Sequence, residues 1–322
     1  MTPIVATQSL SKSYGEILAV DGVSLQVNTG ELFGLVGSDG AGKSTTIRML
    51  TGVLDPTSGT AQVLGLPCSG LESVRGEIGY MSQRFGLYPD LTVAENVRFY
   101  ADIFGLAKGE KSTRSERLLK AANLWEFRNR KAGNLSGGMK QKLGLACALV
   151  HTPKILFLDE PTNGVDPVSR REFWRLLYDL LAEGVTIFVA TAYLDEADRC
   201  HRVGLIHKGK LIACDTPGKL RNLAQYKIIE IVAANPRKSG RILRDSFPDS
   251  PMMLFGDRLH LSTSDPERMR EDAGEVLANA SLEVRSISEV EPSLEDIFVS
   301  IIGDGGMSGN VNGVDDGPSL PP

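Results

Sequence analysis

Short apolar runs alternate with helical stretches from Pro3 to about Leu220, the order typical of an α/β fold with a largely parallel sheet. Three runs, at 32–37, 155–159 and 186–191, are apolar almost throughout. Strands buried on both faces have this pattern, so these runs predict the centre of the sheet.

Two other parts of this region have different patterns. Residues 4–27 alternate apolar and polar positions, which predicts antiparallel strands with a turn near Gly15. Between about Leu91 and Val150 the strand pattern is missing and helical periodicity dominates. We therefore expect a helical lobe inserted over roughly 91–150.

The pattern changes again at about Asn222. The segments YKIIEIVA, PRKSGRILRDSF, MMLFGDRLHLS, PERMREDAGEVLANA and LEVRSISEV follow in turn, with Gly-Asp at the hairpin turn. They predict β-α-β-β-α-β, the order of a ferredoxin-like unit, and SLEDIFVSIIG predicts a closing helix. We expect a first domain over 1–221, a small α+β domain over 222–302, and a disordered tail over 303–322 that is rich in Gly, Asp, Ser and Pro.

Composition adds little to this organisation. The chain has 322 residues, and its net charge of −5 gives no indication of nucleic-acid binding. No run approaches the ~18 apolar residues of a membrane span, and the first residues lack a secretory-signal pattern. A cytoplasmic location is therefore expected, with any membrane role through a partner chain. Four widely spaced cysteines are interpreted as buried, reduced thiols: Cys68, Cys147, Cys200 and Cys214.

The segment GSDGAGKST fits the phosphate-binding pattern G-x-x-x-x-G-K-[ST], and it follows a predicted strand and opens a predicted helix. Its glycines allow the backbone to curl, so that successive N–H groups face an anion. Lys43 supplies a cation for the β- and γ-phosphates, and the Ser44 hydroxyl suits Mg²⁺. The carboxylate of Asp39 would repel phosphate unless it turns outward. The predicted nucleotide-binding residues of this P-loop are Gly37, Ser38, Asp39, Gly40, Ala41, Gly42, Lys43, Ser44 and Thr45.

The apolar run ILFLDEP ends in two adjacent acids, Asp159 and Glu160. Two carboxylates at a strand end are unfavourable together without a cation or a chemical task. We expect Asp159 to hold the metal shell and Glu160 to accept a proton from the attacking water or to orient it. No guanine-reading NKxD pattern is present, which favours ATP over GTP.

A second anion-binding pattern occupies 135–142, LSGGMKQK. Apolar residues recur at helical spacing after it, so Ser136 is predicted to cap a helix. Gly137 and Gly138 would leave the N–H groups of the first turn uncovered for a phosphate. An ordinary capped helix that binds no anion is the alternative for this segment.

The P-loop, LSGG and LDEP in this order, over residues 4–220, resemble the ATP-binding subunits of ABC transporters. The resemblance implies a P-loop NTPase (RecA-like) core with an antiparallel β-subdomain and a helical subdomain, and it implies ATP and Mg²⁺ as cofactors. In that family the signature serine and glycines touch the γ-phosphate held by the P-loop of the other protomer. A head-to-tail pair of nucleotide-binding domains and a membrane permease are the implied partners.

Single residues outside these three motifs also match functional positions of the family. Tyr14, in KSYG, resembles the aromatic that stacks on adenine, although an ordinary strand tyrosine has the same pattern. Gln83 resembles the Q-loop glutamine that touches Mg²⁺ and its water, and Asp166 resembles the D-loop aspartate that crosses the dimer interface. Catalytic roles are thus implied for Glu160, Lys43 and Gln83, and metal contacts for Ser44, Gln83 and Asp159. Three apolar loop residues either line a groove that docks a short helix of the membrane subunit or belong to the lobe core: Phe85, Leu87 and Tyr88.

One position departs from the family pattern. Where the family has a histidine that contacts the γ-phosphate, this chain has Ala192, whose methyl group donates nothing. A lost hydrogen bond to a charged group is worth ~1.5–3 kcal/mol, so weakened turnover is expected. Three explanations stay open: a degenerate half that pairs with a competent partner half, a slow homodimer that relies on Glu160, or an engineered substitution that traps the ATP-bound dimer.

The second domain, ending in EPSLEDIFVS, resembles the C-terminal extension of daunorubicin-exporter ATPases, and parts of the first resemble one half of tandem multidrug-export ATPases. The resemblance implies an ATPase subunit that powers a membrane exporter and lies on the inner face of the cell membrane through its permease. The alternatives are a soluble ABC ATPase that acts on ribosomes or DNA, and a nucleotide-gated clamp with little turnover.

Overall fold

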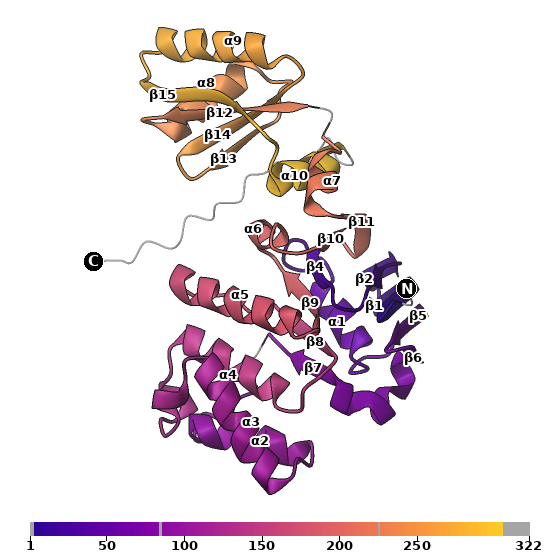
Figure 1. The fold of residues 1–322 in the computed structure, drawn as a ribbon. Helices are drawn as coiled ribbons and strands as arrows, with labels where there is room; N and C mark the ends of the chain where they lie inside the picture. Colours follow the sequence, from indigo (N-terminus) through magenta and orange to yellow (C-terminus); the bar gives the residue numbers. More distant parts are fainter. Residues whose placement is uncertain (1–2, 84–85, 225, 305–322) are drawn as a thin grey trace, which may run out of the picture. The chain divides into compact units, whose positions relative to one another are not determined.

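The structure is a computed structural model that describes residues 3–83, 86–224 and 226–304. Residues 1–2, 84–85, 225 and 305–322 lie outside the described part, and with them Phe85 and most of the predicted tail. The chain divides into two compact units, the first from Met1 to Asn222 and the second from Leu223 onward (Figure 1).

A six-stranded sheet lies at the centre of the first unit, in the order β11-β10-β4-β9-β8-β7. All neighbours in it are parallel except the pair β10 and β11. The three strands predicted at its centre are present and buried along their whole length. Helices and the antiparallel sheet described below cover both of their faces. The strands are β4 (Leu32–Val36), β7 (Ile78–Met81), β8 (Ile155–Asp159), β9 (Thr186–Thr191), β10 (Arg202–His207) and β11 (Lys210–Asp215).

An antiparallel sheet forms from the alternating segment at the start of the chain and from residues that follow the first helix. The predicted turn is present, and Gly15 adopts a φ of 59° there, a left-handed conformation that favours glycine. The strands of this sheet are β1 (Val5–Tyr14), β2 (Ile17–Val23), β3 (Gln26–Val27), β5 (Ser58–Val63) and β6 (Leu66–Pro67).

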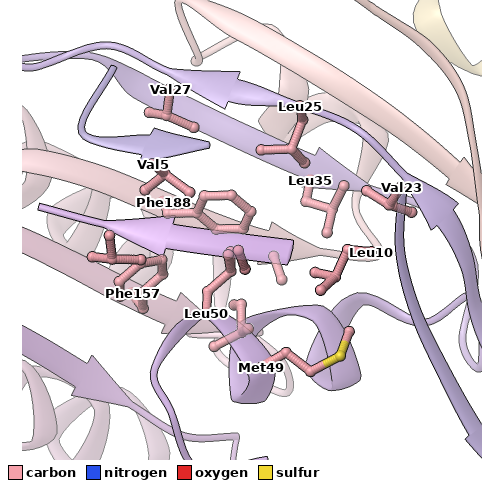
Figure 2. Close-up of a cluster of buried hydrophobic side chains, with 14 of the residues drawn as sticks. Val5, Leu10, Val23, Leu25, Val27, Leu35, Met49, Leu50, Phe157 and Phe188 are labelled. Carbon is pink, nitrogen blue, oxygen red and sulfur yellow. The ribbon is translucent and has the colours of Figure 1, made fainter. Parts of the chain in front are cut away.

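Helix α1 (Lys43–Leu50) lies between these two sheets (Figure 2). Its side chains Met49 and Leu50 are fully buried in one cluster with residues of both sheets. The antiparallel sheet contributes Leu10, and the central sheet contributes Phe157 and Phe188. Burial of this many apolar groups holds the helix in a fixed position against both sheets.

The predicted helical lobe contains three α-helices and two short 3-10 helices. The α-helices gather at the lower left of Figure 1. They share a core that includes Val97, Leu119 and Leu143. Thr92 and Glu95 form a capping box at the start of the first of them. The helices of the lobe are α2 (Val93–Ile103), α3 (Lys108–Ala121) and α4 (Gly137–Leu149). The first unit also contains η1 (Cys68–Glu77), η2 (Trp125–Phe127), η3 (Ala132–Asn134), α5 (Pro167–Ala182), α6 (Leu194–Ala197) and α7 (Pro217–Arg221).

The second unit has the predicted β-α-β-β-α-β order, with a sheet ordered β13-β14-β12-β15. The hairpin turn contains Gly256, whose φ of 60° suits its left-handed conformation. The closing helix continues to Asp304, so residues 303 and 304, which the prediction assigned to the tail, belong to the helix. The elements are β12 (Lys227–Ala233), α8 (Pro236–Ser246), β13 (Met252–Phe255), β14 (Arg258–Thr263), α9 (Pro266–Asn279), β15 (Val284–Val290) and α10 (Leu294–Asp304).

Two other sequence predictions have structural outcomes. All four cysteines are free thiols, and three are buried while Cys214 is only partly buried. Burial raises the pKa of Cys68 to about 12, which keeps its thiol protonated near neutral pH. Over the residues with described coordinates, the helices are too short or too polar to cross a membrane.

A histidine between two carboxylates ties α10 to the sheet of the second unit. His260 Nδ1 lies 3.1 Å from Asp296 Oδ2, and its Nε2 lies 3.4 Å from Glu230 Oε2. Ser293 donates to Asp296, and Arg258 donates to Glu230. Burial lowers the pKa of His260, but the hydrogen bonds and charges of Asp296 and Glu230 outweigh burial, and the pKa is raised above 6.5.

We expect the second unit to lose stability as the pH rises through the folded pKa of His260. A raised pKa means that the stabilisation is complete below the unfolded pKa of about 6.5 and is lost above the folded value. Hydrogen exchange of the β12 and β14 amides, corrected for the intrinsic effect of pH, measures this, since both tryptophans belong to the first unit. The variant His260→Gln should remove the pH dependence. Equal protection of the wild-type amides at pH 6 and pH 9 would contradict the prediction.

Candidate functional site

The P-loop follows β4 and packs closely against the backbone of strands β10 and β2. A Cβ atom at Gly37 would lie 2.1 Å from the carbonyl oxygen of Ile206, and one at Gly42 would lie 2.4 Å from the carbonyl oxygen of Ala19. Gly42 also has a φ of 105°, which side chains rarely adopt. Glycine is therefore required at both ends of the loop, for space as well as for conformation.

The side chain of Lys43 folds back over this loop. Its Nζ donates to the carbonyl oxygens of Gly37 (2.8 Å) and Ser38 (3.0 Å), and it lies 3.1 Å from Glu160 Oε1. Asp39 has 91% of its side chain exposed, and its Oδ1 lies 3.9 Å from Lys43 Nζ. The loop therefore presents its backbone and one ammonium group, which lies between the exposed carboxylate of Asp39 and the buried carboxylate of Glu160.

Ser44 and Asp159 meet where the first turn of α1 faces the end of β8. Ser44 Oγ donates to Asp159 Oδ1 at 2.7 Å. Burial raises the pKa of Asp159, and the Ser44 hydrogen bond opposes this effect. The second oxygen of Asp159, Oδ2, is buried without a hydrogen-bond partner among the described residues. An unpaired buried carboxylate oxygen is costly, and a hydroxyl and a carboxylate are ligands that Mg²⁺ prefers, so these residues fit a magnesium ion.

Glu160 lies directly after Asp159, in a left-handed conformation with a φ of 49°. Its Oε2 accepts hydrogen bonds from Gln83 Nε2 (3.2 Å) and Asn163 Nδ2 (3.1 Å), while Oε1 faces Lys43. A non-glycine residue in this conformation stores strain, which is common at functional sites. The structure thus brings the three predicted catalytic residues together and adds Asn163, which the sequence argument missed.

The signature segment, residues 135–138, lies beside the start of α5, where the predicted D-loop aspartate Asp166 stands. Ser136 caps α4 by accepting from the Met139 N–H at 3.3 Å, as predicted. A Cβ atom at Gly138 would lie 2.5 Å from Ser169, so the start of α4 packs closely on the start of α5. Asp166 caps α5, and hydrogen bonds from the backbone N–H groups of Ser169 and Val168 lower its pKa.

Ser136 and Gly137 are exposed to solvent. Across the described ranges, no hydrogen bond joins Ser136 to the P-loop of its own chain. The structure therefore forms two groups of predicted residues, one around the P-loop and one at the adjoining starts of α4 and α5.

Two further predicted positions border the P-loop. Tyr14 ends β1 with 46% of its surface exposed, and it pairs with Ile17 across the hairpin. The same hairpin contacts the loop through Ala19, next to Gly42. Ala192 directly follows β9 and is partly exposed. The backbone oxygen of Thr191, the residue before it, accepts a hydrogen bond from the Gly37 N–H at 3.3 Å.

A cavity of about 520 Å³ lies between the end of α1, β7 and the helical lobe. Leu87 lines this cavity and also packs against the lobe core. Tyr88 packs with Phe99, at 4.6 Å between ring centroids. Val53 and Ile103 line the cavity and are 65% and 60% exposed, large values for apolar side chains.

Comparisons with known proteins identify relatives. A family model described as ABC transporter matches residues 20–163. A daunorubicin resistance ATP-binding protein of Streptomyces coeruleorubidus is 34% identical over 307 residues, which cover 93% of this chain and 95% of that protein. A probable multidrug ABC transporter ATP-binding protein of Escherichia coli is 45% identical over 219 residues. That match covers 68% of this chain but 38% of the relative, so the chain spans well under half of that protein's length.

A solved structure has the same fold over much of the chain. It is a dimeric ATP-binding cassette in a post-hydrolysis state, bound to ADP and Pi, with a TM-score of 0.61 and 30% sequence identity. The match covers 66% of this chain and 98% of the other.

Proposed function

Since the chain belongs to the ATP-binding subunits of ABC transporters, we propose that it uses ATP and Mg²⁺ to power export through a membrane permease. ATP binding closes it onto a second nucleotide-binding domain, and hydrolysis reopens the pair. The observation that carries the proposal is a pair of contacts at one end of the central sheet. Ser44 Oγ lies 2.7 Å from Asp159 Oδ1, and Lys43 Nζ lies 3.1 Å from Glu160 Oε1.

The P-loop binds the phosphates of ATP through its curled backbone, the ammonium group of Lys43 and the start of α1. Ser44 and Asp159 would hold Mg²⁺, which neutralises charge that develops on the β- and γ-phosphates. Tyr14 suits adenine stacking, because it is exposed on the hairpin that borders the loop.

Glu160 is the proposed base for the attacking water. Gln83 and Asn163 both donate to Oε2, which fixes the orientation of the carboxylate. Oε1 faces Lys43 at 3.1 Å, so the charge that binds the γ-phosphate also lies next to the base. With Oε2 held by two amide donors, Oε1 points toward Lys43, at the end of the site where the γ-phosphate and the attacking water would lie.

The signature segment is proposed to act on the ATP of the second domain. Ser136 and Gly137 are exposed, and the start of α4 provides N–H groups for an anion. Asp166 lies at the adjoining start of α5, where it would face the same partner. The solved relative is described as dimeric, which supports this pairing. The partner domain is a second copy or a competent partner half.

The cavity beside the lobe is the proposed docking groove of the permease. Exposed Val53 and Ile103 offer apolar surface on both sides of it, which suits a short amphipathic helix. Relatives are named for multidrug transport, daunorubicin resistance and Nod factor export, which supports export as the direction. The protein would then lie on the cytoplasmic face of the membrane, attached through this groove.

We expect a Glu160→Gln variant to form a dimer in the presence of Mg²⁺ and ATP, because the bound nucleotide is sealed by both chains and is not hydrolysed. Adding Ser136→Glu should abolish the dimer while ATP still binds to the monomer, since a carboxylate there repels the γ-phosphate. Light scattering coupled to size exclusion measures both states. The control Thr216→Glu places the same charge at another helix cap of the first unit. A strictly monomeric protein, alone and with its companion chains, would refute the joint site.

The substitution Ala192→His should raise the steady-state rate of phosphate release by roughly ten- to a hundredfold, because it supplies a hydrogen bond worth ~1.5–3 kcal/mol in the transition state. The same change in a Glu160→Gln background should give no increase. Equal rates for Ala192 and its histidine variant, with the same partner present, would remove the weakened-turnover proposal. Tight ATP-dependent dimers with almost no phosphate release in both would favour the nucleotide-gated clamp.

The substitution Ile103→Glu should reduce recovery of the permease with this protein from solubilised membranes at least tenfold, because a buried, unpaired carboxylate opposes docking. ATP affinity should stay unchanged, since Ile103 lies on the lobe and outside the P-loop group. Leu223→Glu, at a similarly exposed apolar residue, is the matched control. Full recovery with Ile103→Glu would place the permease elsewhere on the surface.

A further inference from the structure

The carboxylate of Glu196 is completely buried, with 0% of its side chain exposed, yet four side chains donate hydrogen bonds to it. Its Oε1 accepts from Thr162 Oγ1 (2.6 Å), Arg170 Nε (2.6 Å) and Trp174 Nε1 (2.9 Å). Its Oε2 accepts from Thr191 Oγ1 (2.7 Å). One side chain thus joins four donors that come from three separate segments of the chain.

Two of these segments border the proposed ATP site. Thr162 lies in 160–166, between the proposed base Glu160 and Asp166. Thr191 begins 191–193, which contains Ala192, and its hydroxyl also accepts from the Tyr193 N–H at 3.1 Å. The third segment is α5, whose first turn is capped by Asp166. Glu196 therefore connects the loops that follow β8 and β9 through its own two oxygens.

Arg170 provides the compensating charge. It binds Glu196 and the exposed Asp195 (2.7 Å), and its guanidinium lies 4.4 Å from the centre of the Tyr193 ring. Burial lowers the pKa of Arg170, but the bonds to both carboxylates outweigh it, so the group stays charged. The ring contact fixes 191–193 from the side that faces solvent, while Glu196 fixes it from the interior.

A buried ionic network is not required for stability alone, because apolar residues of similar volume often fill such a site equally well. Its distinctive property is directional, since each hydrogen bond fixes one donor relative to the same buried carboxylate, and a buried donor that moves away loses its partner. A shift of 160–166 alone would take the buried Thr162 hydroxyl away from the Glu196 carboxylate, and a shift of 191–193 alone would take away Thr191, the donor to Oε2. The two loops are thereby constrained to move together.

We propose that Glu196 is a positioning residue that makes 160–166 and 191–193 move as one body, so that contact of Asp166 with the partner domain is transmitted to Glu160. This inference rests on the proposed function, because it assumes that a partner domain meets Asp166. Glu196 does not touch the nucleotide. It acts through Thr162 on the loop that holds the base and through Thr191 on the end of β9.

The test uses Trp174 as a reporter of the network, in the full chain with Trp125→Phe as the common background, because the chain has only these two tryptophans. ATP with Mg²⁺ should change the emission of Trp174 when the partner domain is present. In Glu196→Gln this response should be lost and phosphate release should fall roughly tenfold or more, as expected for a displaced catalytic group. The Kd for ATP should stay within about twofold.

Two further variants separate positioning from folding. Thr162→Val keeps the shape of the side chain but removes the donor of 160–166, and it should lower the rate without preventing folding if Glu196→Gln fails to fold. Asp195→Asn removes an exposed ligand of Arg170 and leaves Glu196 unchanged, so the rate and the emission response should both persist.

The opposite results are distinct. If Glu196→Gln and Thr162→Val keep the wild-type rate and emission response and lower only the melting temperature, Glu196 is a structural residue and the inference is overturned. If the unsubstituted protein fails to bind ATP, the proposed function is overturned first, and this inference falls with it.

Discussion

Helix α1 is held between two sheets, and the position of its first turn determines where Lys43 and Ser44 lie. The apolar cluster around Met49 and Leu50 fixes the far end of the helix, while the near end begins in a loop with no room for side chains at Gly37 and Gly42. The helix cannot move toward β8 or away from it without opening this cluster, which is costly. The distance of 2.7 Å between Ser44 and Asp159 follows from that constraint.

This fixed arrangement also explains the charge distribution. Asp159 and Glu160 are adjacent and both buried, which is unfavourable for two carboxylates. Lys43, Gln83 and Asn163 satisfy Glu160, but one oxygen of Asp159 has no partner in the described part of the chain. The site therefore has a local deficit of positive charge, which the proposed Mg²⁺ ion would relieve. Stability and ligand binding are linked through the same group.

The family and the fold class could be predicted from the sequence, because their signals are local. Apolar runs become buried strands, glycine patterns become the P-loop, and a serine before two glycines caps α4. Asn163 and Glu196 could not be found in this way. Glu196 stands among acidic residues in a short helix, where the sequence suggests a solvated side chain, and only the packing of α5 against the loops after β8 and β9 buries it. The closing helix was predicted from its apolar run SLEDIFVSIIG, and helix α10 ends one residue beyond that run, at Asp304.

The residues around Ala192 fix the backbone at this position, although the family's histidine is absent from it. Its neighbours Thr191 and Tyr193 are held by Glu196 and Arg170, so the backbone at 192 is fixed although the methyl group offers nothing to a phosphate. In the proposed mechanism the chemistry of hydrolysis would then depend on Glu160, whose loop is joined to the same carboxylate through Thr162. In such an arrangement the loop after β9 contributes position while the loop after β8 contributes chemistry. A chain with this division would still close around ATP, and its rate would depend on how firmly the proposed partner domain holds the two loops in register.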